Sequence, residues 1–210
     1  MNAHDDHLKG SESRLWNLVH QRTCPGADKA AIDARIWDLF GETWAILFTD
    51  LAGFSRQTAL FGITHFLQII HEQKRILLPI LAAHDGILIK MEADSFLMLF
   101  RRPAAALGCA IAMQQACQSY NRHKVPEEHV LLCLGIGFGR ILKIGDGEVY
   151  GAEVNAAAKL GEDTAKAAEI LVTAAARDAL GEAFGDCRYE PLLEVVPGSA
   201  RNYRVHYAAG

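Results

Sequence analysis

Residues 44–55 read Trp-Ala-Ile-Leu-Phe-Thr-Asp-Leu-Ala-Gly-Phe-Ser, and this stretch decides the fold. A short, continuously apolar run such as 44–49 is typical of a buried strand. Asp50 closes that run, and Asp94 separates two further strand-like stretches, so both carboxylates are expected on rigid backbone at the edge of a sheet. Two carboxylates placed in this way could share divalent cations, which assist displacement at phosphorus. Taken singly, each aspartate could equally cap the helix or turn that follows it.

From residue 43 onward the chain alternates between strand and helix patterns. Strands are predicted at 44–49, 87–91, 95–100, 130–144, 170–173, 187–196 and 202–207. Helices are predicted from Phe54, over 64–84, from Pro103 to about Tyr120, over 153–161 and over 174–181. Strand, helix, hairpin, helix, strand is the ferredoxin-like order. The predicted fold class is therefore α+β, with a ferredoxin-like mixed, mostly antiparallel sheet and helices packed on one of its faces.

Residues 1–43 are predicted to form an N-terminal helical extension, followed by one main domain over 44–210. Helical spacing appears in 11–20 and again in 28–40, with Cys24-Pro-Gly between them. Such a segment could cover the sheet, link to a regulatory partner or receive a signal. The sequence leaves these three roles open.

Bulk properties exclude several classes of protein. The chain has 210 residues, a net charge of -4 and 22% charged residues, which argues against a nucleic-acid partner because such proteins carry a dominant basic field. The first residues are polar, and no stretch approaches the ~18 apolar residues of a membrane span. The cysteines are odd in number and lack metal-ligand spacing, which predicts a reducing, cytoplasmic localisation.

Three separated motifs carry a family resemblance. Segments 48–55, 90–94 and 149–159 occur in the order and spacing of class III nucleotidyl cyclase catalytic domains, the adenylate and guanylate cyclases. The chain resembles this family from about Trp44 to Tyr207, which makes 44–210 the expected cyclase catalytic domain. Three motifs in the right order are far more specific than any single glycine pattern.

The resemblance implies a two-metal site at the strand ends. Asp50 and Asp94 correspond to the carboxylates that bind two divalent cations, Mg²⁺ or Mn²⁺, and the backbone carbonyl matching Leu51 joins them. One cation lowers the pKa of the ribose 3′-hydroxyl and the other neutralises the departing pyrophosphate. The family's triphosphate-binding segment matches Gly53, Phe54 and Ser55.

The resemblance also implies a base-reading pair. Lys90 stands where adenylate cyclases carry a lysine that donates to N1 of adenine, whereas guanylate cyclases tend to carry Glu there. Glu148 stands where Asp or Thr accepts a hydrogen bond from the adenine amino group. These residues favour ATP as substrate. A solubilising lysine at a strand end and a glutamate on a surface turn are the alternative interpretations.

Three more residues match catalytic or phosphate-binding positions of the family. Asn155 corresponds to the asparagine that orients the ribose. Lys159 replaces the usual arginine, which keeps the charge but loses the planar fork, and a solvated helix lysine is its alternative. Arg140 matches a position that can contact the phosphates.

This chain also departs from the family pattern. Ala93 replaces the usual Gly before the second metal-binding aspartate, and Glu92 replaces an apolar residue. No clear equivalent exists for the lysine that grips the terminal phosphate, for which Arg201 is a weak substitute.

In the family, one subunit supplies the metal carboxylates and the other supplies the base-reading lysine and the asparagine helix. This chain carries both halves, so a homodimer with two equivalent sites is expected. The predicted function is an adenylate cyclase that converts ATP to cyclic AMP and pyrophosphate. Two alternatives are a cyclase for GTP or a pyrimidine nucleotide, and a non-catalytic nucleotide-binding regulatory domain.

Overall fold

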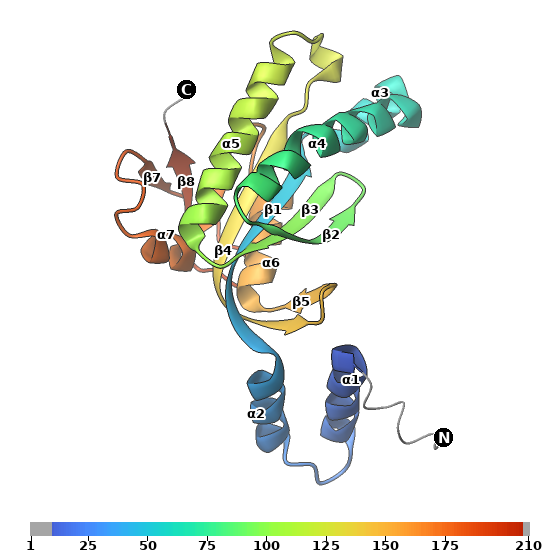
Figure 1. Ribbon diagram of the computed structural model, residues 1–210, viewed down its shortest axis with the longest axis vertical. Helices are drawn as coiled ribbons and strands as arrows, with labels where there is room; N and C mark the ends of the chain where they lie inside the picture. Colours follow the sequence, from blue (N-terminus) through green and yellow to red (C-terminus); the bar gives the residue numbers. More distant parts are fainter. Residues whose placement is uncertain (1–9, 208–210) are drawn as a thin grey trace.

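A computed structural model describes residues 10–207, and the side chains of all of these except 54–57. Its centre is one eight-stranded sheet in the order β2-β3-β1-β4-β6-β8-β7, with β5 paired to β4 (Figure 1). The strands are β1 (Gly41–Leu51), β2 (Ile87–Glu92), β3 (Ser95–Phe100), β4 (Leu132–Ile144), β5 (Glu148–Tyr150), β6 (Ile170–Thr173), β7 (Arg188–Pro191) and β8 (Asn202–His206). The β4–β6 pair is parallel and the other pairs are antiparallel. The predicted mixed, mostly antiparallel α+β sheet is confirmed.

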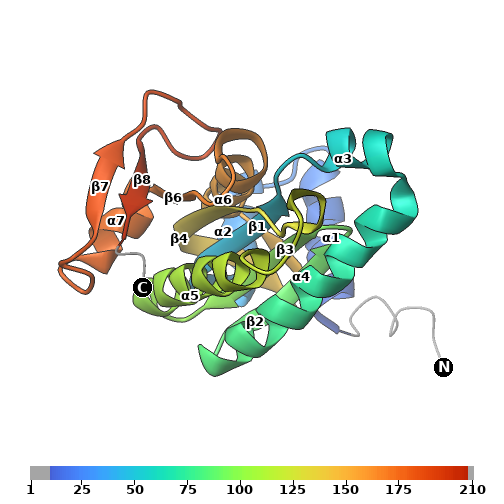
Figure 2. The ribbon, with the colours of Figure 1, turned by 90° about the horizontal axis from the view of Figure 1, so that it is seen from above.

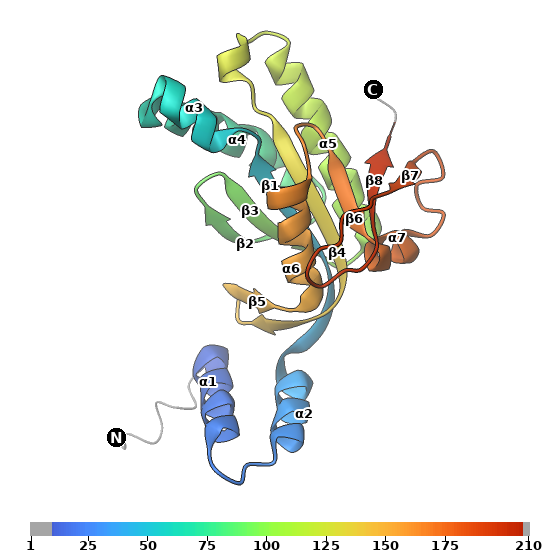
Figure 3. The same cartoon turned by 180° about the vertical axis from the view of Figure 1, so that it is seen from behind.

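Helices cover both faces of this sheet. The α-helices among the described residues are α1 (Gly10–Thr23), α2 (Lys29–Phe40), α3 (Phe54–Phe61), α4 (Ile63–Ala83), α5 (Pro103–Asn121), α6 (Ala152–Lys159) and α7 (Ala174–Leu180). Helices α4, α5 and α7 share one core with the sheet, and α6 packs on the opposite face (Figures 2 and 3). The expectation of helices on one face is therefore wrong. The reason is visible in β1, which is apolar at successive positions and so needs cover on both sides.

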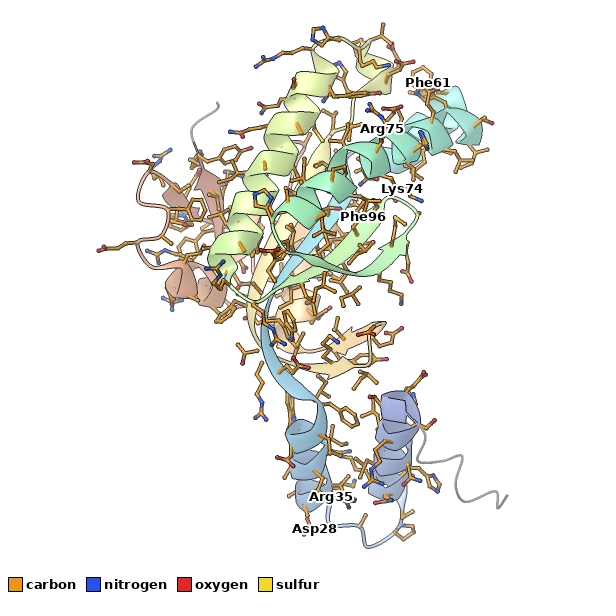
Figure 4. All side chains as sticks on the ribbon, in the orientation of Figure 1. Asp28, Arg35, Phe61, Lys74, Arg75 and Phe96 are labelled. Carbon is orange, nitrogen blue, oxygen red and sulfur yellow. The ribbon has the colours of Figure 1, made fainter. Side chains whose placement is uncertain are left out.

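Strand β1 supplies both cores because its side chains alternate between the two faces. Ala45 and Leu47 belong to the larger cluster under α4 and α5, whereas Trp44 and Ile46 belong to the cluster under α6. All four are nearly or fully buried. In Figure 4 Phe96 of β3 lies beneath α4, where it is fully buried. The apolar run 44–49 therefore lies in the middle layer of the domain.

The N-terminal helices α1 and α2 stand at one end of the molecule (Figure 1). They form a small apolar cluster of their own that also contacts the tip of β4. Its buried members are Leu15, Leu18, Ile32, Ile36, Phe40 and Ile144. Asp28 caps α2 by accepting a hydrogen bond from the Ala31 N–H. Strand β1 begins at Gly41, inside the segment 1–43 that the sequence assigned to the extension.

The structure contains one strand that was not predicted, and it shortens one that was. Strand β5 was not predicted, because three residues after a Gly-Asp-Gly turn are too short to show periodicity. The expected strand 187–196 shrinks to β7, and the chain from 192 to 201 forms a connection that packs partly against α6. Within residues 10–207, none of the helices combines the length and the apolar character needed to cross a membrane.

Candidate active site

The two predicted metal-binding aspartates lie side by side at one end of the sheet. Asp50 is the second-last residue of β1, and Asp94 lies in the turn between β2 and β3. The β1–β3 register pairs Thr49 with Phe96, which places Asp50 next to Ser95. The Ser95 hydroxyl donates to Oδ1 of Asp50 at 2.9 Å. The strand ends therefore bring both carboxylates to one edge.

This edge is rich in negative charge. Burial raises the pKa of Asp50 to about 6, the Ser95 hydrogen bond opposes that rise, and the charges of Asp94 and Glu162 add to it. Asp94 is only 7% exposed, and burial likewise raises its pKa, with Glu162 contributing. A cation at this edge would stabilise the ionised carboxylates and so lower both pKa values, which burial above all has raised.

The donor set fits a hard divalent cation, because Mg²⁺ and Mn²⁺ prefer carboxylate and phosphate oxygens. Among the described residues, no group of three or more His, Cys, Asp or Glu side chains is arranged to hold a metal ion. Two carboxylates leave coordination positions of such a cation open to other oxygen ligands.

The backbone after Asp50 follows the predicted course. Leu51 ends β1 as a buried residue, and α3 begins at Phe54. Gly53 precedes that helix with φ +82°, a left-handed conformation that glycine adopts without strain. Free N–H groups at a helix start suit phosphate oxygens. The assignments of Gly53, Phe54 and Ser55 to the triphosphate stay predictions.

A buried glutamine that the sequence analysis missed supports Asp94. Gln73 on α4 is fully buried, and its Nε2 donates to the Asp94 carbonyl oxygen at 2.8 Å. The turn it holds is unusual, because Ala93 sits at φ +49°, where glycine is favoured. The available signal was a polar residue on the apolar face of α4, three residues after Ile70 and four before Leu77.

Replacing Gln73 by Met should destabilise the fold and weaken metal binding. The Asp94 carbonyl would be left without its donor inside the core, at a cost of about 1–3 kcal/mol of unfolding free energy. The strained turn at Ala93 would also lose its anchor, so Mn²⁺ affinity should fall. Urea unfolding and a Mn²⁺ titration followed by electron paramagnetic resonance measure the two effects. The control is Gln68→Met, which removes an exposed glutamine of the same helix α4, whose side chain donates to Glu128. Equal losses of stability and of Mn²⁺ affinity in both variants would contradict the role of Gln73.

The raised pKa of Asp50 predicts a stability that depends on pH in the absence of metal. Its ordinary pKa is 3.8 and its folded-state pKa is about 6. The folded state therefore holds the proton more tightly, so the contribution of Asp50 is most favourable below about pH 4 and is lost as the pH rises through about 6. Asp50→Asn should be the more stable protein in EDTA by about 1–2 kcal/mol at neutral pH, a figure reduced for partial solvent exposure. Urea unfolding of both proteins at acid and neutral pH measures this difference. A difference in unfolding free energy that does not grow with pH would contradict the prediction.

Helix α6 carries Asn155 and Lys159 and is fixed tightly to the sheet. A Cβ on Gly137 would lie 2.5 Å from the Glu153 carbonyl oxygen, so only glycine permits this close approach of β4 to α6. Oε2 of Glu153 accepts from the Phe138 N–H at 3.0 Å and from the Thr173 hydroxyl at 2.7 Å. The glycine run of β4 thus serves helix packing, and Glu153 is an anchor that the sequence analysis did not identify.

The exposed face of α6 presents the predicted catalytic side chains. Asn155 is exposed, and Nζ of Lys159 pairs with Oδ2 of Asp163 at 2.8 Å. The helix widens into a π-helical turn, Leu160–Thr164, instead of continuing to Gly161 as predicted. π-turns inside helices are frequent at functional sites. This turn carries Glu162 to the vicinity of Asp50.

The predicted base-reading residues come together although they are far apart in sequence. Nζ of Lys90 lies 3.5 Å from Oε1 of Glu148 and 3.1 Å from Oε1 of Glu92. These two carboxylates, Glu92 foremost, raise the pKa of Lys90. Strand β5 is what places Glu148 beside β2.

Arg140 lies elsewhere. Its Nη2 donates to the Trp37 carbonyl oxygen at 2.9 Å, and its guanidinium lies over the Trp37 ring at 5.1 Å. On β1 its partner is Thr43, seven residues before Asp50, which is about 23 Å at ~3.3 Å per residue. The structure does not bring Arg140 to the aspartates of its own protomer, and a contact of Arg140 with the phosphates stays a prediction. The sequence placed Arg140 on its strand but did not show that α2 ends beside it.

Comparison with known proteins assigns the chain to a family. The family described as the adenylate and guanylate cyclase catalytic domain matches residues 41–202. A protein of Rhizobium meliloti (strain 1021) that carries the name "Putative adenylate cyclase 3" is 30% identical over 116 residues, which is 55% of this chain and 20% of that relative. The chain therefore spans a fifth of the length of that relative.

Solved structures show the same fold. The adenylate/guanylate cyclase/hydrolase of Silicibacter pomeroyi has a TM-score of 0.68 and 29% identity, covering 79% of this chain and 95% of its own. The adenylyl cyclase CyaB of P. aeruginosa has a TM-score of 0.67 and 18% identity, covering 80% and 95%. The match over residues 41–202 covers most of the chain, which therefore belongs to the adenylate and guanylate cyclase catalytic domain family.

Proposed function

We propose that this protein is an adenylate cyclase that converts ATP to 3′,5′-cyclic AMP and pyrophosphate. The observation that carries the choice of ATP is the pairing of Lys90 with Glu148, Nζ to Oε1, at 3.5 Å. Adenine presents an acceptor at N1 beside the donor of its amino group. A lysine donor next to a glutamate acceptor matches that edge. Guanine presents an N–H donor and a carbonyl acceptor there, which would meet like groups.

The protein's own residues would act by positioning and charge. Asp50, Asp94 and the Leu51 carbonyl would hold two divalent cations, Mg²⁺ or Mn²⁺, which supply Lewis-acid stabilisation of the attacking and departing oxygens. The backbone of 53–55 would bind the triphosphate. Asn155 would orient the ribose so that the 3′-oxygen faces the α-phosphorus in line.

The reaction balances without any further reactant. The 3′-oxygen forms a bond to the α-phosphorus, the bond from that phosphorus to the pyrophosphate oxygen breaks, and the 3′-hydroxyl proton leaves to solvent. Lys159 would stabilise the extra negative charge on the α-phosphate as the new bond forms. Its ammonium is already localised by Asp163, 2.8 Å away, which limits the loss caused by replacing the arginine of the family.

We further propose a homodimer with two shared sites. Apolar side chains gather at the elbow between α3 and α4, directly beyond the loop that follows Asp50; Leu60, Phe61, Ile63 and Leu67 are each 47–65% exposed. Phe61 projects from the end of this elbow in Figure 4. Exposed apolar patches of this kind mark interaction surfaces. A second copy placed here would cover the patch and bring its α6 toward the aspartates.

The extension, residues 1–43, is proposed to be the point of regulation. A cavity of about 390 Å³ lies between α1 and the β4–β5 hairpin, lined among others by Leu15, Trp16, Ile144 and Glu148. Movement of α1 would therefore change the surroundings of Glu148, which is proposed to bind the adenine amino group. The cytoplasm, where ATP is available, is the proposed site of action.

The test is direct turnover. Purified protein incubated with ATP and Mn²⁺ should release cyclic AMP and pyrophosphate in equal amounts, measured by mass spectrometry. Parallel reactions with GTP, CTP and UTP test the rival selectivities. No cyclic product from any nucleotide, together with measurable nucleotide binding, would favour the regulatory-domain alternative. Two features already favour that alternative: Lys159 in place of the family's arginine, and no clear equivalent of the lysine that grips the terminal phosphate.

A further inference from the structure

The ammonium of Lys90 is held by two carboxylates, and only Glu148 has so far been given a role. Oε1 of Glu92 is the nearer partner, at 3.1 Å from Nζ. Glu92 comes from β2 itself, two residues beyond Lys90, whereas Glu148 comes from β5. Figures 1 and 3 show β5 next to the β2–β3 hairpin on the side where α1 lies. The ammonium is therefore approached from two separate elements.

We infer that Glu92 is a positioning residue that fixes the ammonium of Lys90 for base selection, an inference that rests on the proposed function. A lysine ammonium has three N–H donors and no acceptor. Two donors directed at Glu92 and Glu148 leave the third for an acceptor on the ligand. A lysine side chain also loses rotamer entropy when it binds a ligand, and part of that loss has already occurred when two carboxylates hold the side chain.

The same contact should set selectivity against guanine. An ammonium held on both sides stays in the path of the guanine ring N–H, which is a donor and is repelled. Without Glu92 the flexible side chain of Lys90 can turn toward solvent. The carboxylate of Glu148 would then be free to accept the guanine N–H. Glu92 thus converts a mobile lysine into a fixed donor.

The position of Glu92 suits this role better than a role in folding. Its side chain is 71% exposed, and that of Lys90 is 45% exposed. Exposed ion pairs contribute little to stability. A glutamate in place of the apolar residue usual in the family therefore has a ligand-directed explanation, and a variant at this position should fold normally.

The test compares Glu92→Gln with Glu92→Asp for both ATP and GTP in Mn²⁺. Glu92→Gln should lower kcat/KM for ATP about tenfold, mostly through KM, and lower the value for GTP less. The ATP-to-GTP ratio should drop about fivefold or more, and Glu92→Asp should restore part of it. Calorimetric binding of α,β-methylene-ATP, which does not require turnover, should weaken by a similar factor in Glu92→Gln.

The matched control is Glu128→Gln, which removes the glutamate of another surface pair, Lys124–Glu128, at 3.2 Å. It should leave the ATP-to-GTP ratio unchanged. An unchanged ratio and unchanged analogue binding in Glu92→Gln would overturn the inference, as would equal losses for both nucleotides. If the unaltered protein made no cyclic nucleotide, the proposed function would fail. The analogue-binding comparison would still decide whether Glu92 holds Lys90 for a base.

Discussion

Asp50→Asn and Asp94→Asn should each lower cyclic AMP formation by about 10³-fold or more, which corresponds to at least about 4 kcal/mol of lost transition-state stabilisation. Each change keeps the shape of the side chain but removes the charge that a divalent cation requires. Asn at position 50 can still accept the Ser95 hydrogen bond, so the strand end stays intact. Initial rates at saturating ATP and a series of Mn²⁺ concentrations give the measurement.

The control for these variants is Asp33→Asn, which neutralises an exposed aspartate paired with Arg22 in the N-terminal helices. It should leave the rate at saturating ATP within about twofold, because surface pairs contribute little. Circular dichroism and unfolding curves must show that Asp50→Asn and Asp94→Asn remain folded. Folded variants that retain near-normal turnover would remove both aspartates from the metal site.

Mixing two inactive variants should restore activity if the sites are shared. Asp94→Asn loses the metal side of a site and Asn155→Ala loses the ribose side, where the loss should be about 10²-fold or more. In a hybrid dimer one site carries both defects and the other carries neither. Random exchange at equal amounts makes about half of the dimers hybrid, so the mixture should recover about a quarter of the normal rate.

The outcome separates shared sites from sites built within one protomer. A dimer whose sites each lie within one chain would show no recovery, and neither would a protein that stays monomeric. The same mixture measured at increasing dilution should lose its recovered activity as the dimers dissociate. Sedimentation at the same concentrations supplies the oligomeric state independently.

Much of the fold was predictable because most elements carry strong local signals. The apolar runs 44–49 and 95–100 and the apolar face of 64–84 gave strands and a helix within a few residues of those observed. Strand β5 could not be predicted because a three-residue strand is too short to show hydrophobic periodicity. The cover on both sheet faces was missed, although successive apolar residues in β1 already required it.

The candidate site was predictable only where residue type and motif coincide. Asp50 and Asp94 end apolar runs, so their proximity followed from strand pairing. The contact between Lys90 and Glu148 depends on how β5 folds back, and the sequence could not give it. The residues that support the site could not be identified from the sequence for the same reason. Gln73 and Glu153 act through hydrogen bonds to backbone groups that are distant in sequence. The sequence likewise could not show that the Arg140 guanidinium donates to the Trp37 carbonyl oxygen near the end of α2.

The long pairing of β1 with β4 has a mechanical consequence. It continues without a break from Gly41, where α2 ends, to Leu51, next to the paired acids. A hydrogen-bonded ribbon resists stretching but can twist. Torque applied to the N-terminal helices would therefore rotate the far end of the ribbon, and with it the spacing of the two acids. In this arrangement a sensor attached at residue 10 could tune chemistry at residue 50 without touching it.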